Sequence, residues 1–135
     1  MSVPLRVRDY MVRDVATVPP DMDVMRVVHI LNERDLSGVV VIDAEGKPLG
    51  IITERDCIEV VTQSSYFDEH AGPASEYMST PLETVTPEDS LMDVAQRMAR
   101  SPYRRFPVVE EGRLVGLIGR RDVLRVLASG NWFPR

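Results

Sequence analysis

Two short segments of the sequence carry residue types suited to holding a phosphate and a diol. The first reads Gly50-Ile51-Ile52-Thr53-Glu54-Arg55-Asp56. Its glycine permits close approach to the backbone, and the free N–H groups at the start of a following helix favour an anion. Thr53 can donate a hydroxyl, and the carboxylate of Asp56 can accept both hydrogens of a diol. This segment is therefore a candidate binding site.

The same residues also suit a purely structural role. Thr53 is a favourable N-cap, and an acidic residue three positions later, Asp56, interacts well with the positive end of a helix. Capping alone would account for the segment, so both interpretations stay open.

The second segment reads Gly116-Leu117-Ile118-Gly119-Arg120-Arg121-Asp122. It keeps the glycine and the carboxylate, but Gly119 stands where the first segment has a hydroxyl. Basic side chains are dense around it, and the chain places these seven arginines in one stretch: Arg100, Arg104, Arg105, Arg113, Arg120, Arg121 and Arg125. A small anion can bind to such a stretch, although a solvated basic face is the alternative.

No set of side chains typical of catalysis or of a metal site is found. His29 lies beside an apolar helical stripe, His70 lies in a segment without periodicity, and Cys57 has no evident base partner. Cys57 is expected to be a small buried hydrophobe, with a redox role as the alternative. We expect neither an enzyme nor a bound metal.

Charge and hydropathy exclude further classes of function. The net charge of −5 argues against a nucleic-acid partner, because such binding depends on neutralising phosphates. No apolar run approaches the roughly 20 residues that span a bilayer, and Met1-Ser2-Val3-Pro4 does not resemble a signal peptide. The expected location is the cytoplasm, without membrane association.

The elements that would position these residues occur twice along the chain. Tyr10-Met11 recurs as Tyr77-Met78, and Thr17-Val18 recurs as Thr84-Val85, both at an offset of 67 residues. An amphipathic helical stripe at residues 24–31 recurs at 91–98, and a β-hairpin pattern follows each stripe. A second helix, at 55–63 and again at 121–128, completes each repeat.

The pattern predicts an α/β (α+β) protein of two βαββα repeats. Repeat 1 is expected at residues 1–63, a linker at 64–73, repeat 2 at 74–128 and a C-terminal tail at 129–135. Because about 60 residues with one small sheet bury too little apolar surface to fold alone, the repeats should pack sheet against sheet as one module.

The doubled pattern, together with the two closing segments, resembles the CBS (cystathionine beta-synthase) domain pair over residues from about Val7 to Leu127. The resemblance implies pseudo-twofold symmetry, clefts between the repeats and an adenosine-type ligand: AMP, ADP, ATP or S-adenosylmethionine. No covalently bound cofactor is implied.

The resemblance also implies roles for individual residues. Phosphate contacts fall to Thr53, Arg104, Arg105, Arg120 and Arg121. Ribose contacts fall to Asp56 and Asp122. The adenine pocket falls to Val18, Val39, Val85 and Phe106, all of which are equally good core residues, and Gly50, Gly116 and Gly119 are the glycines of close approach. The cleft served by Arg104, Arg105 and Asp122 is favoured, because the first repeat has the uncharged Ser37-Gly38 at the corresponding place.

Two function classes follow. The leading hypothesis is a free-standing regulatory module that senses the nucleotide, forms a homodimer and acts on a regulated protein in trans. Its dimer contacts are expected on the second-helix faces at Ile58, Val61, Val123 and Val126. The alternative is a ligand-free dimerisation or adaptor module that docks a partner protein.

Overall fold

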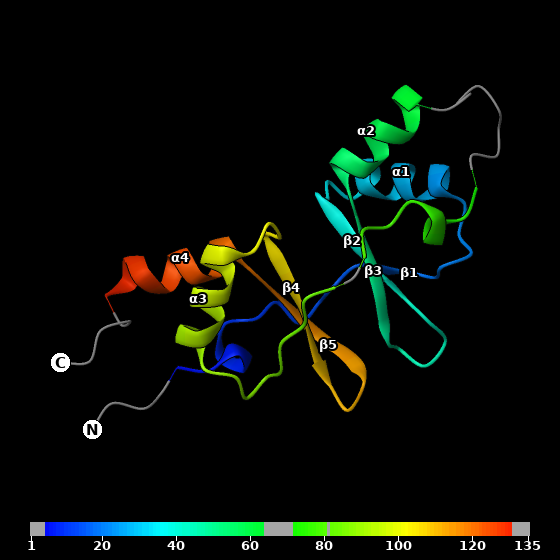
Figure 1. The fold of residues 1–135 in the computed structure, drawn as a ribbon. Coiled ribbons are helices and arrows are strands. Elements are labelled where there is room, and N and C mark those ends of the chain that lie inside the picture. Colours follow the sequence, from blue (N-terminus) through cyan, green and yellow to red (C-terminus); the bar gives the residue numbers. More distant parts are fainter. Residues whose placement is uncertain (1–4, 64–71, 81, 131–135) are drawn as a thin grey trace. The chain divides into compact units, whose positions relative to one another are not determined.

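The computed structural model describes residues 5–63, 72–80 and 82–130, apart from the side chains of Val61 and Gln63. It is a mixed α/β structure, as expected (Figure 1). The helices and strands follow in this order: β1 (Thr17–Val18), α1 (Val24–Glu33), β2 (Gly38–Ile42), β3 (Pro48–Thr53), α2 (Glu54–Gln63), α3 (Leu91–Arg100), β4 (Arg105–Glu110), β5 (Arg113–Gly119) and α4 (Arg120–Ser129). The expected first strand of the second repeat is reduced to a single bridge between Val85 and Val108.

The chain divides into two compact units that exchange their leading segments. Unit 1 comprises residues 1–14 and 83–135, and unit 2 comprises residues 15–82. The N-terminal segment pairs with the second repeat, since Val12 bridges to Leu117 on β5. The matching segment of the second repeat pairs with the first, since Ser79 bridges to Ile51 on β3. Each unit is therefore completed by residues that lie far away in the sequence.

Unit 2 is a three-stranded sheet in the order β1-β2-β3, covered by α1 and α2 (Figure 1). β1 runs parallel to β2, and β2 runs antiparallel to β3. The core lies between helices and sheet, because Val27 and Leu31 of the helical stripe pack with the buried residues of the strands. Asp23 caps α1 by accepting a 2.9 Å hydrogen bond from the N–H of Met25.

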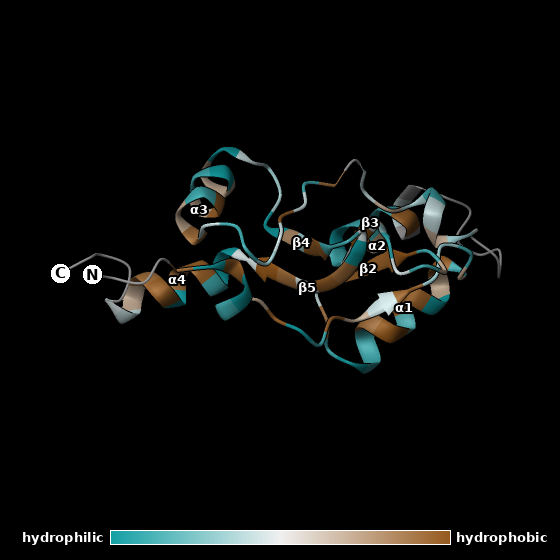
Figure 2. Cartoon of the chain, turned by 90° about the horizontal axis from the view of Figure 1, so that it is seen from below, coloured by the Kyte–Doolittle hydropathy of each residue, from teal (hydrophilic) through white to brown (hydrophobic). Residues whose placement is uncertain are grey.

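Unit 1 is built around the antiparallel pair β4–β5, with α3 and α4 packed together beside it. Leu91, Val94 and Met98 of α3 join Phe106, Val108 and Ile118 of the strands in its core. Figure 2 shows the strands coloured hydrophobic along most of their length, whereas the helices carry both hydrophobic and hydrophilic residues. The buried residues of the helices face the strands, and most of the charged helix residues are exposed.

One expectation about the helix surfaces was wrong. Val123 and Val126 do not form an exposed face for a dimer partner, because both are buried in the core of unit 1. The apolar residues of α4 that are exposed are instead Leu124 and Leu127. The side chain of Val61 and residues 64–71 of the expected linker lie outside the described residues. So does the apolar pair Trp132-Phe133, which the sequence predicts to pack on the module itself or on a second subunit.

A methionine from each exchanged segment packs onto a strand glycine of its unit. A Cβ atom added to Gly50 on β3 would lie 2.5 Å from the sulfur of Met78, and one added to Gly116 on β5 would lie 2.7 Å from the sulfur of Met11. Only glycine leaves room for this contact without a shift of the methionine. Within the described residues, no helix is long and apolar enough to cross a membrane.

Candidate functional site

In unit 2, the junction of β3 and α2 brings Thr53 and Asp56 together. Oδ2 of Asp56 accepts hydrogen bonds from the N–H and the hydroxyl of Thr53, at 2.9 and 3.1 Å. The N–H of Asp56 donates in return to Oγ1 of Thr53 at 3.3 Å. This is the reciprocal geometry of a capping box, so Thr53 and Asp56 do cap the helix.

The other carboxylate oxygen of Asp56 is less committed. Oδ1 lies 3.5 Å from the hydroxyl of Ser79, at the limit of hydrogen bonding, and the carboxylate is only half-buried. Ser37 lies close by, because its carbonyl oxygen accepts from the N–H of Glu54 at 3.0 Å. Capping therefore leaves one oxygen of Asp56 able to accept a further hydrogen bond.

In unit 1, Asp122 has the position that Asp56 has in unit 2. Its Oδ2 accepts from the N–H of Gly119 at 2.8 Å, and its Oδ1 lies 3.1 Å from Nη1 of Arg125. Asp122 is buried, whereas the Arg125 side chain is 75% exposed and free to move aside. Gly119 offers no hydroxyl, so the N–H of Asp122 lacks the acceptor that Thr53 gives to Asp56.

The arginines expected at this junction lie beside it. Arg105 pairs with Gly119 across the β4–β5 ladder. The N–H of Arg120, the first residue of α4, donates to the carbonyl oxygen of Arg104 at 3.0 Å. Arg104, Arg120 and Arg121 are exposed. The start of α4 therefore combines a helix N-terminus with basic side chains, which is a favourable setting for an anion.

The four residues assigned to the adenine pocket are all buried. Val18 and Val39 belong to the core of unit 2, and Val85 and Phe106 belong to the core of unit 1, each with an exposed fraction of at most 2%. Packing explains these four residues completely in this structure, and their contact with an adenine stays a prediction.

The three glycines differ in what lies next to them. Methionine sulfur occupies the space in front of Gly50 and Gly116. The nearest atoms to a Cβ at Gly119 are Cγ of Arg105 at 3.4 Å and the carbonyl oxygen of Arg104 at 3.5 Å, which is ordinary contact. Of the three glycines, Gly119 lies against the basic side chains.

Sequence reasoning missed Ser79 as a neighbour of Asp56. The offset of 67 residues aligns Ser79 with Val12, so the sequence does show a hydroxyl in one repeat where the other has an apolar side chain. The sequence does not show that each of these two segments pairs with the strand of the other repeat. Unit 2 thus offers hydroxyls around its carboxylate, and unit 1 offers arginines.

Cys57 follows Asp56 in α2 but has no reactive character. Its side chain is buried. Burial, and then the negative charges of Asp56 and Glu54, raise the pKa of its thiol to about 11. Across residues 5–63, 72–80 and 82–130, no group of three potential metal ligands comes together.

Comparison with other proteins identifies the repeat. A family model described as CBS domain matches the chain twice, at residues 7–63 and 74–129. The CBS domain-containing protein YhcV of Bacillus subtilis is 33% identical over 117 residues, which cover 87% of this chain and 81% of that protein. An uncharacterized protein of Methanocaldococcus jannaschii is 32% identical over 91% of this chain, but the chain spans only 43% of its length.

Solved structures share the fold. The Arabidopsis thaliana protein CBSX2 in complex with AMP has a TM-score of 0.80 at 24% identity, covering 92% of this chain and 96% of that one. The CBS domain pair of MJ0100, in complex with 5-methylthioadenosine and S-adenosylmethionine, has a TM-score of 0.82 at 22% identity, covering 95% and 99%. With both repeats matched over most of its length, the chain belongs to the CBS domain family.

Proposed function

We propose that this CBS pair is a regulatory module that binds an adenosine nucleotide, and that the start of α4 in unit 1 holds its phosphate and ribose. The observation that carries the proposal is the junction of β5 and α4, where Arg104 and Arg105 flank a helix N-terminus and a buried carboxylate. AMP and S-adenosylmethionine bound to proteins of the same fold support an adenosine-type ligand.

The phosphate is assigned to the arginines and the helix start. Arginine presents a planar fork of donors that matches phosphate oxygens, and the uncapped N–H of Asp122 adds a backbone donor. Arg120 and Arg121 extend the basic surface. Because Gly119 has no side chain, a phosphate oxygen can take the place that Oγ1 of Thr53 has at the other junction.

The ribose is assigned to Asp122. A carboxylate can accept from both hydroxyls of a ribose diol, and the exposed Arg125 can release Oδ1. Asp56, Thr53 and Ser79 form the corresponding set in unit 2, without arginines. We assign to this set in unit 2 a weaker affinity for the nucleotide than to the set around Asp122 in unit 1. The family resemblance implies a cleft between the repeats, whereas the contacts that support binding lie within each unit separately.

A thermal-shift screen with variants tests this assignment. AMP, ADP, ATP and S-adenosylmethionine should be compared, since a ligand at 100 times its dissociation constant adds about 2.7 kcal/mol of stability. Asp122→Asn is the sharpest variant, because its amide oxygen can still accept from Gly119 while the negative charge is lost. Arg113→Ala is the matched control, since Arg113 is exposed at the opposite end of β5.

The expected result is a shift with at least one adenosine ligand that is reduced in Asp122→Asn and in Arg105→Ala and kept in Arg113→Ala. No shift with any ligand at millimolar concentration would contradict nucleotide binding. An equal shift in all variants would contradict the assignment to unit 1.

A second candidate function is dimerisation or partner docking. The observation that favours it is exposed apolar surface on the second helix of each unit, with Ile58 62% exposed on α2, and Leu124 and Leu127 53% and 40% exposed on α4. Leu124 and Leu127 are three residues apart and therefore share one side of α4, where they can form a single apolar contact surface. Analytical ultracentrifugation should show a homodimer that Leu124→Glu weakens. A sedimentation coefficient of a monomer in both proteins would contradict it.

A further inference from the structure

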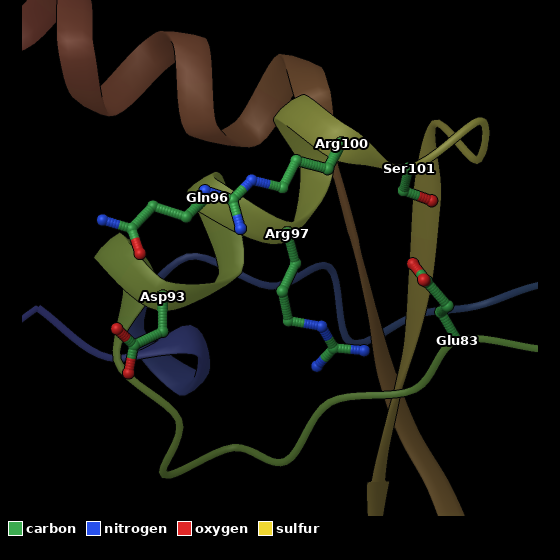
Figure 3. Close-up of a pocket in the computed structure, with 6 residues that line it drawn as sticks. All are labelled: Glu83, Asp93, Gln96, Arg97, Arg100 and Ser101. Atoms are coloured by element: carbon green, nitrogen blue, oxygen red, sulfur yellow. The ribbon is translucent and has the colours of Figure 1, made fainter.

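A hollow lies beside α3 in unit 1, lined by polar and charged residues that the proposed nucleotide site does not use (Figure 3). Its volume is about 380 Å³, within the range of small-molecule pockets. Its lining residues are Glu83, Asp93, Gln96, Arg97, Arg100 and Ser101. Five of these come from α3 and the residue after it, and Glu83 comes from the segment that leads to Val85.

One oxygen of Glu83 is the notable feature of the hollow. Oε2 is buried and has no hydrogen-bond partner. A buried polar atom without a partner is costly, so its presence calls for a donor that the chain itself does not supply.

Arg97 faces the same opening. Its guanidinium lies 5.3 Å from the centre of the Phe106 ring, in a cation–π contact that holds it in place. In Figure 3 the side chains of Arg97 and Glu83 extend into one opening, Arg97 from the helix and Glu83 from the segment opposite. The two side chains form no ion pair with each other. The Glu83 carboxylate can therefore accept a hydrogen bond from a ligand, and the Arg97 guanidinium can donate one to it.

The other repeat shows that the fold does not need these charges. At the offset of 67 residues, Glu83 corresponds to Ala16 and Arg97 corresponds to Ile30. Both Ala16 and Ile30 pack against the core of unit 2. The same positions of the same fold are therefore filled by apolar contacts in one unit and by an unpaired carboxylate and a guanidinium in the other.

We propose that this hollow binds a small zwitterion of the free α-amino acid class. The Glu83 side chain, which is only half-buried, turns Oε2 toward the opening to accept from the ammonium, and the adjacent carboxylate of the ligand accepts from the fork of Arg97. Gln96 and Arg100 then meet a polar side chain at the outer rim. Because the lining carries two carboxylates and two guanidiniums, a ligand of zero net charge suits it better than an anion.

The test is a titration of the ¹⁵N-labelled full chain with L-glutamine, followed by amide chemical shifts. Two analogues separate the two contacts: N-acetyl-L-glutamine lacks the ammonium, and L-glutaminamide lacks the carboxylate. Two variants install the residues of the other repeat, Glu83→Ala and Arg97→Ile, and the dispersion of their spectra reports that they fold. Arg113→Ala again serves as the control.

We expect saturable shifts of the amides of Glu83 and α3 with L-glutamine. Each analogue and each variant should weaken binding by at least about tenfold, since a charged hydrogen bond is lost in every case. Chemical shifts of equal size with N-acetyl-L-glutamine, or in the Glu83→Ala variant, would overturn the proposal. The absence of any chemical-shift change with L-glutamine at about 50 mM would also overturn it, because a concentration of that order is enough to detect millimolar binding. AMP binding at α4 is measured separately, so failure of one site does not decide the other.

Discussion

At the scale of single residues, each carboxylate at a helix start has two tasks that compete for its oxygens. Asp122 and Asp56 both cap a helix with Oδ2, and only Oδ1 is left for a ligand. In Asp122 this second oxygen is already near Arg125, and in Asp56 it is near Ser79. Ligand binding and helix stability are therefore coupled at these two positions, and variants must be chosen to separate them.

The capping contact predicts how Asp122 variants unfold. Asp122→Ala should lower the free energy of unfolding by about 1–2 kcal/mol, because the N–H of Gly119 loses its acceptor. Asp122→Asn should retain most of the stability, since its amide oxygen can replace Oδ2. Urea denaturation of both variants measures the difference. Equal loss in the two would mean that charge, and not the hydrogen bond, stabilises the helix start.

The raised thiol pKa predicts a pH dependence for Cys57. Between the ordinary pKa of 9.0 and the folded-state value of about 11, the unfolded chain releases the thiol proton while the folded chain keeps it. Stability that is present below pH 9 should therefore decline as the pH rises through this window, and Cys57→Ala should reduce the decline. The native thiol should also react with iodoacetamide more slowly than the urea-unfolded chain at pH 9. A native thiol that titrates below 9 would contradict its burial.

Part of this residue-level picture could be predicted from the sequence. The approach of Arg105 to Gly119 follows from hairpin pairing, which is local. The neighbour Ser79 could not be predicted in the same way, because it reaches Asp56 across 23 residues through strand pairing. Arg125 was missed although its signal is local, since residues three apart on a helix are neighbours.

At the scale of elements, the contact between methionine and glycine fixes each exchanged segment to its sheet. Gly50→Ala should cost about 1–3 kcal/mol, because the new Cβ would lie 2.5 Å from the sulfur and 2.9 Å from Cβ of Met78. In a Met78→Ala background the cost should largely vanish, which a double-mutant cycle by urea denaturation measures.

Gly119→Ala is the matched control for this prediction. Its backbone is extended, and the nearest atom to the new Cβ lies at 3.4 Å. It should leave stability nearly unchanged. If Gly119→Ala and Gly50→Ala cost the same, loss of glycine as such would explain the effect, and the packing of Met78 would not.

The elements themselves were largely predictable, because periodicity is a local signal. The helical stripes and the hairpins lie where the sequence places them, to within a residue or two at their ends. The prediction failed where packing is non-local. Thr84 and Val85 match Thr17 and Val18 in sequence, yet they form one bridge and not a strand. Val123 and Val126 were assigned to a surface that the sheet of their own unit covers.

At the scale of the whole molecule, the exchange of segments ties the N-terminal residues to the C-terminal half of the chain. Val7 is fully buried in the core of unit 1, among Val85, Leu91 and Phe106. Backbone bonds add to this tie, since the N–H of Val7 donates to the carbonyl oxygen of Asp89 at 3.1 Å. The two units in space thus differ from the two repeats in the sequence, because residues 1–14 belong to the same unit as residues 83–135.

Val7→Ala tests this tie. The variant should lose roughly 1.5–3 kcal/mol of stability, in keeping with a buried valine side chain. Hydrogen exchange should quicken in α3, β4 and β5 more than in α1, β2 and β3, although Val7 precedes all of them in the sequence. Faster exchange confined to the first repeat would contradict the exchanged arrangement.

The proposed nucleotide binds through its phosphate and its ribose at the start of α4. Isothermal titration calorimetry with AMP, adenosine and 2′,3′-dideoxyadenosine monophosphate tests it most directly, because the second ligand lacks the phosphate and the third lacks the diol. We predict saturable binding of AMP that is at least about tenfold weaker for either analogue and for Asp122→Asn. Equal affinity for the three ligands, or no heat with millimolar AMP, would contradict binding of a nucleotide at this junction.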